Sequence, residues 1–257
     1  MSKDYDILLF GITGFTGKLA AEILLRNGAY GLKWGGCARN AAKATAVLAD
    51  ICKSVGGVAP PAVEVADLVC ADAAAEDKLR AVVKKTKVVL TTAGPFEKYG
   101  VTLIKLCAEE GVHYADITGE SDFFRAAVLA HDAAARKSGA VVVPHCGNDC
   151  VPWDLTVLKM HEAAAAKGVT LKSCATYTEF AASMGMSGGT LTTAVYQLGK
   201  ARGAKPSFDP LLTDAGGAKS QFSTLNKSPK SDIKCAEFGR SGGPRVMGPG
   251  MANCVRR

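Results

Sequence analysis

Short apolar runs alternate with longer amphipathic stretches through the first 145 residues of the chain. The runs have the length of buried strands, and the longer stretches repeat apolar residues three and four positions apart, as one face of a helix requires. Strands are predicted at residues 4–11, 32–38, 62–66, 87–92, 113–117 and 140–145, and helices at residues 15–27, 41–54, 73–84, 101–110 and 121–137. Because strands alternate with helices, the pattern predicts an α/β fold of the Rossmann type, with right-handed crossovers and a doubly wound parallel sheet.

The pattern changes after Pro152. A helix is predicted at residues 153–166, a strand-like run at 169–180, a glycine- and serine-rich turn at 185–189 and a further helix at 190–202. Residues 203–245 lack clear periodicity and hold many Gly, Pro, Ser and Lys residues, which is typical of loops or short edge strands. We therefore predict a first domain over residues 1–150 and a second, incomplete α/β domain over residues 151–257.

Three glycines directly follow the first predicted strand, in the segment GITGFTG. Gly11 permits a sharp turn, Gly14 lets the backbone approach a pyrophosphate, and Gly17 lets the next helix pack closely on the strand. The phosphates would lie at the N–H groups and the positive dipole end of that helix. A glycine turn without a ligand is the alternative, whereas a P-loop is excluded by Ile12 and Leu19, which stand where it needs Gly and Ser or Thr. The predicted dinucleotide-binding residues of this turn are Gly11, Thr13, Gly14, Phe15, Thr16 and Gly17.

The end of the second predicted strand selects between two cofactors. An NAD enzyme usually places a carboxylate there for the ribose 2′-hydroxyl, whereas NADP requires a cation for its 2′-phosphate. Residues 32–49 contain no acid, and Arg39 and Asn40, which follow the strand directly, are predicted to bind the cofactor. An arginine can stack on adenine and pair with a phosphate, so NADP is the predicted cofactor; a solvated arginine is the alternative. Asp67 and Leu68, after the third strand, are predicted to touch the adenine, although Asp67 can equally cap a turn.

Small residues follow the fourth predicted strand, at Ala93, Gly94 and Pro95. In a sheet ordered 3-2-1-4-5-6 this turn faces the cofactor, so these residues are predicted to leave room for the ribose and nicotinamide. The candidate catalytic residues are Tyr99, whose phenol can donate a proton, and Asp149, after the sixth strand. Packing of Tyr99 and helix capping by Asp149 are the alternatives. His145 is expected to be a hydrogen-bonded histidine at a strand end rather than the proton donor.

The composition narrows the class of protein. Hydrophobic residues make up 48% of the chain, yet no apolar run approaches the roughly 18 residues of a membrane span. A polar start without a signal peptide leads us to expect a cytoplasmic protein. The net charge is +7, but residues 219–257 hold eight basic and two acidic residues, which leaves the rest almost balanced, so no nucleic-acid partner is expected. The nine cysteines form no Cys-x-x-Cys pair, and no metal site is predicted.

Several separated segments resemble the saccharopine dehydrogenase-like oxidoreductases. The similar segments are GFTG at 14–17, AR at 38–39, AGPF at 93–96 with YG at 99–100, YADITGE at 114–120, GNDCVPWD at 147–154 and GGT at 188–190. In the segment at 147–154, Asn148 and Cys150 replace a Phe and a Ser of the family's pattern. The resemblance implies an NAD(P)-dependent fold with a second domain that shapes the substrate site, closest to the lipid-linked enoyl reductases. It also implies that the chain is truncated at its C-terminus, because members of the family continue past a Val-Arg-Arg segment.

Two main hypotheses of function follow. The first is an NADP-dependent oxidoreductase that reduces a C=C or C=N bond of a lipid-like or amino-acid-derived small molecule, with Tyr99 or Asp149 handling the proton. The second is a non-catalytic dinucleotide-binding or lipid-droplet-associated protein. The basic residues of 219–257 favour a peripheral contact with a membrane or lipid droplet, with a solvated loop as the alternative. A homodimer is compatible with either hypothesis.

Overall fold

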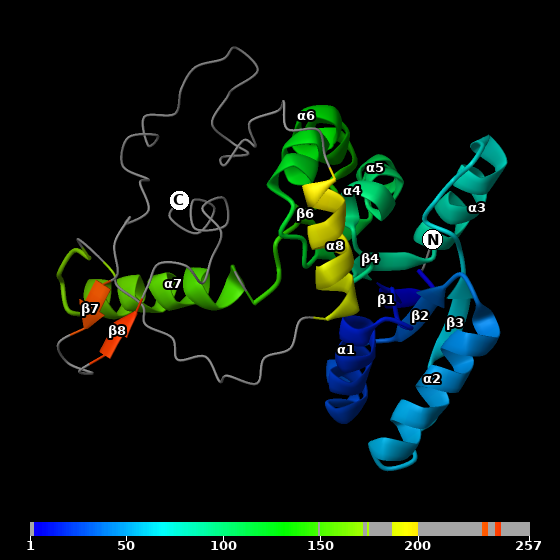
Figure 1. Cartoon of the computed structure of the whole chain (residues 1–257), viewed down its shortest axis with the longest axis horizontal. Coiled ribbons are helices and arrows are strands. Elements are labelled where there is room, and N and C mark those ends of the chain that lie inside the picture. The colour runs from blue at the N-terminus through cyan, green and yellow to red at the C-terminus, as the bar shows by residue number, and fades with distance from the viewer. Residues whose placement is uncertain are drawn as a thin grey trace.

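The computed structural model describes residues 3–148, 150–171, 174, 187–199, 233–235 and 240–242 (Figure 1). Its strands are β1 (Tyr5–Phe10), β2 (Trp34–Ala38), β3 (Ala62–Val65), β4 (Thr86–Thr91), β5 (His113–Asp116), β6 (Val142–Val143), β7 (Ile233–Cys235) and β8 (Arg240–Gly242). Its helices are α1 (Phe15–Arg26), η1 (Gly28–Gly31), α2 (Ala41–Ser54), α3 (Ala73–Val83), α4 (Phe96–Tyr99), α5 (Val101–Glu110), α6 (Ser121–Ser138), α7 (Val151–Ala166) and α8 (Gly188–Leu198).

Strands β1 to β6 form one parallel sheet in the order β3-β2-β1-β4-β5-β6. This order is the predicted one, and the doubly wound Rossmann architecture is therefore confirmed. The direction of winding reverses between β1 and β4, which pair along their whole length from Tyr5↔Thr86 to Phe10↔Thr91. Their carboxyl ends thus meet at the crevice where doubly wound sheets bind ligands.

Two apolar cores cover the two faces of the sheet, and the alternation of side chains along β1 separates them. Leu8 and Phe10 face one core, together with residues of α3, α5 and α6. Leu9 faces the other core, together with residues of α1 and α2. Figure 1 shows α1 and α2 on one side of the strands and α3, α5 and α6 on the other. The cores fix the strand ends, and so the edge on which a ligand can lie.

The sixth strand is shorter than predicted, because only Val142 and Val143 pair with β5. Pro144 follows and has no N–H to continue the ladder, and His145 adopts a left-handed backbone with φ 60°. The strand-like run predicted at 169–180 lies mostly outside the described residues, and no strand is present at 169–171. The helix predicted at 190–202 begins two residues earlier, as α8, and ends at Leu198.

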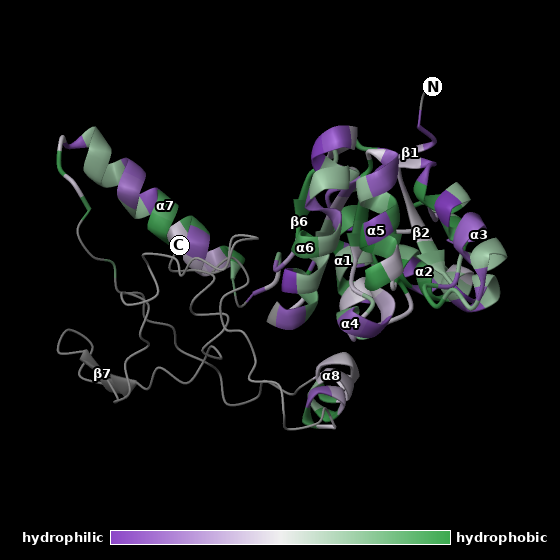
Figure 2. Ribbon diagram, turned by 90° about the horizontal axis from the view of Figure 1, so that it is seen from above, coloured by the Kyte–Doolittle hydropathy of each residue, from purple (hydrophilic) through white to green (hydrophobic). Residues whose placement is uncertain are grey.

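Helices α7 and α8 differ from the helices of the sheet domain, because neither contains a buried residue. Both views show α7 apart from the helices that cover the sheet (Figure 1 and Figure 2). The boundary predicted at residue 150 falls directly before α7, and it remains a prediction. No helix in the described parts of the chain is long and apolar enough to cross a membrane.

Candidate dinucleotide-binding site

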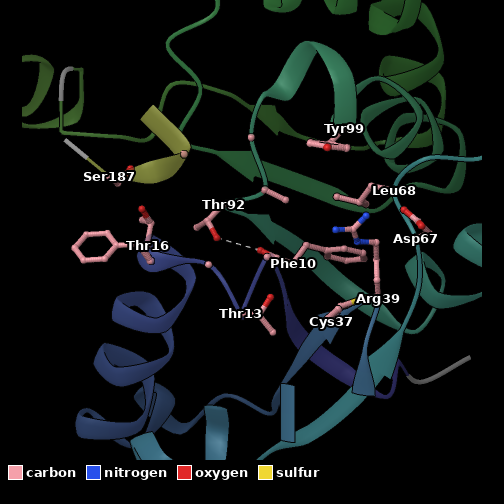
Figure 3. A pocket seen from close by; sticks show the side chains of 17 residues that line it. Phe10, Thr13, Thr16, Cys37, Arg39, Asp67, Leu68, Thr92, Tyr99 and Ser187 are labelled. Carbon is pink, nitrogen blue, oxygen red and sulfur yellow. Dashed lines mark hydrogen bonds between the residues drawn. The ribbon is translucent and has the colours of Figure 1, made fainter. Parts of the chain in front are cut away.

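A cavity of about 350 Å³ lies at the carboxyl ends of β1, β2 and β4 (Figure 3). It is lined by Phe10, Gly11, Thr13, Gly14, Phe15, Thr16, Cys37, Ala38, Arg39, Asp67, Leu68, Thr92, Ala93, Gly94, Tyr99, Ser187 and Gly189. Most of the residues predicted to bind a dinucleotide are therefore brought to one cavity, although they come from four separate turns of the sheet domain.

The glycine turn forms the floor of the cavity. Gly11 has φ 84°, and a Cβ on it would lie 2.9 Å from Thr92 Oγ1 and 3.0 Å from the Ala93 nitrogen. Gly14 is the N-cap of α1 and provides no side-chain cap, so the first N–H groups of the helix stay available to a ligand. A free helix N-terminus beside an open backbone turn is the usual binding site for a pyrophosphate.

Gly17 lies beneath the cavity instead of lining it. A Cβ on Gly17 would stand 2.1 Å from the Gly11 carbonyl oxygen, a separation that no packed structure tolerates. Gly17 is therefore needed for the close contact between α1 and the end of β1, as its position in the motif predicts. It shapes the turn and is not among the residues that line the cavity.

The end of β4 is held to the end of β1 by the Thr92 residue. The Thr92 backbone N–H and hydroxyl both donate to the Phe10 carbonyl oxygen, at 3.1 and 3.2 Å. Figure 3 shows this contact between the glycine turn and the far wall of the cavity. Ala93 and Gly94 line the cavity directly after it, whereas Pro95 is buried behind them.

Arg39 and Asp67 are the charged residues among those that line the cavity. Arg39 is exposed and follows β2, and Figure 3 shows its guanidinium near Leu68 and Asp67. Asp67 Oδ1 accepts a hydrogen bond from the Val69 N–H at 3.0 Å, so its carboxylate also stabilises its own turn. Among the described residues Arg39 has no ion pair, and its charge is available to a phosphate.

Three predicted residues do not line the cavity, and a fourth lies outside the described residues. Asn40 caps α2, since its side chain accepts from the Lys43 N–H at 2.9 Å. Gly17 and Pro95 support the turns from below. Asp149 lies outside the described residues, so its role remains a prediction. Tyr99 lines the cavity at its upper wall in Figure 3, with the Lys98 ammonium 5.2 Å from its ring centroid.

The sequence did not point to several lining residues. Phe10 and Cys37 are the buried ends of β1 and β2, and burial raises the pKa of the Cys37 thiol to about 12, so it is an uncharged wall. Their place follows from strand register, which local patterns do not reveal. Ser187 and Gly189 come from α8, far along the chain. Their only signal was the resemblance of the GGT segment at 188–190 to the family pattern.

The comparison with protein families decides the identity of the fold. Residues 7–143 match the saccharopine dehydrogenase NADP binding domain. The chain belongs to this family. The residues present fit the cofactor: the backbone turn is open to a pyrophosphate, and a free arginine stands where the 2′-phosphate would lie. NADP is therefore the cofactor of this NADP-binding domain.

Similar curated proteins come from mycobacteria. A trans-acting enoyl reductase of Mycobacterium tuberculosis is 31% identical over 275 residues, which cover 99% of this chain and 61% of that protein. A putative trans-acting enoyl reductase of the same species is 32% identical over 229 residues, which cover 81% of this chain and 52% of that protein. The chain thus spans between half and three fifths of the length of these relatives.

Solved structures with a similar fold are more distant in sequence. The match to yeast methylglyoxal/isovaleraldehyde reductase Gre2, complexed with NADPH, has a TM-score of 0.30 and 21% identity and covers 42% of this chain and 36% of that chain. The match to a β-ketoacyl-[ACP] reductase of Bacteroides thetaiotaomicron has a TM-score of 0.37 and 14% identity, with 54% and 74% covered. The Rossmann assignment therefore rests on the sheet topology and the family match.

A buried polar cluster supports the NADP-binding domain next to the cavity, at the ends of β5 and β6. The Asp116 carboxylate is fully buried and accepts from the Tyr114 hydroxyl at 2.7 Å, the Thr118 N–H at 2.9 Å and the His145 N–H at 3.2 Å. Burial nevertheless raises the pKa of Asp116, with the hydrogen bonds opposing the shift. The cluster ties β5 to the residues after β6.

Glu120 links this cluster to the cavity. Its two carboxylate oxygens accept from the N–H groups of Phe96 and Glu97, at 2.8 and 2.9 Å, at the start of α4. The contact holds the turn at Ala93 and Gly94 in place from behind. Glu120 is the N-cap residue of α6, but its side chain gives no cap to that helix and binds the start of α4.

His145 differs from the hydrogen-bonded histidine that was expected. Its side chain is buried, and neither ring nitrogen has a hydrogen-bond partner in the described parts of the chain. The ring contacts Phe124 edge-on, with 5.4 Å between the ring centroids. Burial lowers the pKa of His145. The nearby Thr118 backbone opposes part of this shift, although its distance and angle to the ring do not meet those of a hydrogen bond. The ring is thus held neutral mainly by its apolar surroundings.

Proposed function

We propose that the chain is the NADP-binding part of an NADPH-dependent oxidoreductase that reduces a C=C bond conjugated to a carbonyl group. The cavity, with Arg39 at the end of β2, supports NADPH as the electron donor. The names of the mycobacterial relatives, trans-acting enoyl reductases, support an enoyl group as the acceptor. A C=N bond of an amino-acid-derived substrate is the other acceptor that suits the family.

The residues of the cavity have separate tasks in this proposal. Bound NADPH supplies a hydride to one carbon of the double bond. The glycine turn and α1 hold the pyrophosphate, and Arg39 pairs with the 2′-phosphate, with Leu68 and Asp67 beside the adenine. In the proposal Ala93 and Gly94 would leave space beside the nicotinamide, and the Tyr99 phenol, which lines the same cavity, would give a proton to the second carbon. Asp149 stays a second candidate donor.

Arg39 provides the sharpest test of the cofactor assignment. We predict that Arg39→Ala weakens NADPH binding by about 1.5–3 kcal/mol, the range of a charge-assisted hydrogen bond, and leaves NADH binding nearly unchanged. Isothermal titration with both cofactors measures this difference. Lys43→Ala is the matched control, because Lys43 is exposed on the first turn of α2 and does not line the cavity. An equal loss of affinity for the two cofactors would show that Arg39 does not bind the 2′-phosphate.

Turnover separates the proposal from its alternative. NADPH oxidation is followed at saturating cofactor with a 2-enoyl thioester and with a cyclic imine as substrates. Reduction of the enoyl thioester supports the proposal. Reduction of the imine alone would show that the enzyme reduces a C=N bond and not a C=C bond. NADPH binding without turnover on either substrate favours a non-catalytic dinucleotide-binding protein.

Other expectations of location and assembly stay proposals. The basic segment at 219–257 lies outside the described residues except at 233–235 and 240–242, so its contact with a membrane or lipid droplet is untested. The cytoplasmic location and the homodimer are likewise predictions. Flotation with anionic liposomes tests the contact, and light scattering measures the assembly.

A further inference from the structure

Helix α8 reaches the cofactor cavity from outside the sheet domain. Ser187 and Gly189, at its start, line the same cavity as Phe15 and Thr16 at the start of α1. Figure 3 shows Ser187 facing Thr16, at the end of the cavity away from Arg39. Two segments that lie far apart in the sequence therefore form opposite walls of the NADP site.

Packing does little to hold α8 in this position. No residue of the helix is buried, and its apolar side chains stay open: Leu191 is 54% exposed, Val195 62% and Leu198 85%. An isolated helix of this length is marginal in water. Among the described residues, side-chain burial therefore contributes little to the position of α8, and a ligand in the shared cavity would add a contact.

The start of α8 has the chemistry to contribute to that interaction. Ser187 caps the helix, and its hydroxyl accepts from the Thr190 N–H at 3.1 Å. The cap leaves the N–H groups of Gly188 and Gly189 without an intrahelical acceptor, as at the start of any helix. A Cβ on Gly189 would meet only Ser187 Oγ, at 3.7 Å, so its backbone is open toward the cavity.

The opposite wall has the same character. Gly14 gives α1 no side-chain cap, so the N–H groups of its first turn are also available. Two positive helix ends face one cavity, and the family supplies the anion independently of either helix, since NADP carries a pyrophosphate. A dianion between the two ends satisfies both sets of donors.

We propose that the Ser187–Gly189 segment is the second wall of the NADP site, and that the pyrophosphate of bound NADP fixes α8 against the sheet domain. Gly189 is a binding residue in this arrangement, because a side chain there would fill space that the cofactor needs. The inference rests on NADP binding in the cavity and is independent of the bond that is reduced. It makes the cofactor a link between the sheet domain and the chain that follows α7.

Hydrogen exchange of the whole chain tests the link directly. With saturating NADPH, we expect slower amide exchange in the first turn of α1 and also in residues 188–191. The compound 2′-phospho-ADP-ribose keeps the pyrophosphate but lacks nicotinamide, and it should slow exchange in both segments. Adenosine 2′-monophosphate lacks the pyrophosphate and should slow exchange in neither. Protection of α1 without α8 overturns the inference. Protection of α8 by NADPH alone assigns the contact to the nicotinamide and overturns the pyrophosphate contact.

Two neighbouring glycines offer a matched pair of variants. Gly189 lines the cavity and Gly188 does not, and a Cβ on Gly188 would meet nothing within 4 Å. We expect Gly189→Leu to weaken NADPH binding about tenfold or more, equivalent to the loss of a hydrogen bond to a charged group. Gly188→Leu should change binding less than about twofold, a difference of a few tenths of a kcal/mol. Equal effects of the two variants would contradict a wall at Gly189.

Failure of this inference can be told from failure of the cofactor assignment. If NADPH does not bind in the cavity, the first turn of α1 shows no protection and neither glycine variant changes affinity. If NADPH binds without α8, α1 is protected and α8 exchanges as in the free chain. Since no residue of α8 is buried, Gly189→Leu should leave the melting temperature of the free chain unchanged, which would exclude a folding defect as the cause.

Discussion

Asp116 is a fully buried carboxylate at the end of β5. Three donors converge on its carboxylate, from Tyr114, Thr118 and His145, and all three residues are buried. Loss of the acceptor therefore leaves several buried polar groups without a partner at once. Such groups cost far more than the bond itself contributes.

We predict that Asp116→Ala lowers the free energy of unfolding by about 3–5 kcal/mol, because three buried donors lose their acceptor at about 1–3 kcal/mol each. Asp116→Asn should cost less, because its amide oxygen still accepts from the backbone. Urea denaturation measures both. Asp132→Ala is the control, since Asp132 forms an exposed ion pair with Arg136 within α6 and its loss should change stability little. A mild effect of Asp116→Ala would mean that water replaces the carboxylate.

The burial of the His145 side chain leads us to predict that the stability of the fold depends on pH. Burial places its pKa in the folded chain below the ordinary value near 6.5, so the unfolded chain takes up the proton first. Its contribution to stability is therefore complete above about pH 6.5 and is lost as the pH falls toward the pKa of the folded chain. His145→Asn, which suits the left-handed backbone at φ 60°, removes this loss.

Unfolding by urea at pH 7.5 and 5.5 measures the effect. The parent chain should lose more stability over this interval than His145→Asn, by up to about 1.4 kcal/mol for each pH unit in which the proton is taken up. Asp116 and His131 also titrate with shifted pKa values, but they are present in both chains and cancel in the comparison. Identical pH profiles would show that the His145 ring is solvated in the folded chain.

At the scale of elements, the packing of α1 on β1 shapes the phosphate-binding turn. Gly17→Ala puts a methyl group at the Gly11 carbonyl oxygen, and α1 must shift to accept it. We predict a loss of about 1–3 kcal/mol in unfolding free energy, the usual cost of overpacking, together with weaker NADPH binding. Lys18→Ala, at an exposed position of the same helix, is the control. Unchanged NADPH affinity in Gly17→Ala would show that the position of α1 does not affect binding of the phosphates.

The elements of the sheet domain were predictable because each carries its own periodicity. The strand order and the position of the glycine turn followed from β1, α1 and the alternation after them. Asn40 was assigned to the cofactor because it adjoins Arg39, yet the side chain caps α2. Glu120 follows β5, yet its carboxylate accepts from the start of α4, which lies much earlier in the chain. Local patterns locate a strand end and do not reveal which partner a side chain finds there.

The contribution of α8 to the cavity was beyond prediction for a related reason. Its GGT segment was noticed, but nothing in the sequence placed it opposite Thr16. Such a contact depends on the path of the chain between α7 and α8, and periodicity carries no information about that path. The same holds for Cys37, whose wall position comes from the pairing of β2 with β1.

At the scale of the whole molecule, the two apolar cores are formed entirely by residues before the start of α7. Helices α7 and α8 bury no residue, so the described residues after 150 add little to the free energy of folding of the sheet domain. A fragment of residues 1–148 should therefore unfold cooperatively on its own, which also tests the domain boundary proposed at residue 150.

The same fragment keeps the wall of the cofactor site at α1 and lacks the wall at α8, so it tests the contribution of α8 to binding. Because NADPH binds the folded state alone, it should raise the stability of the fragment by about 2.7 kcal/mol at a concentration one hundred times its Kd. The Kd itself should be higher for the fragment than for the whole chain, since Ser187 and Gly189 are missing from the cavity. Calorimetric melting with and without NADPH measures both quantities. A fragment that stays unfolded would place part of the folding free energy beyond residue 150, whereas a folded fragment with an unchanged Kd would leave α8 without a part in holding NADP.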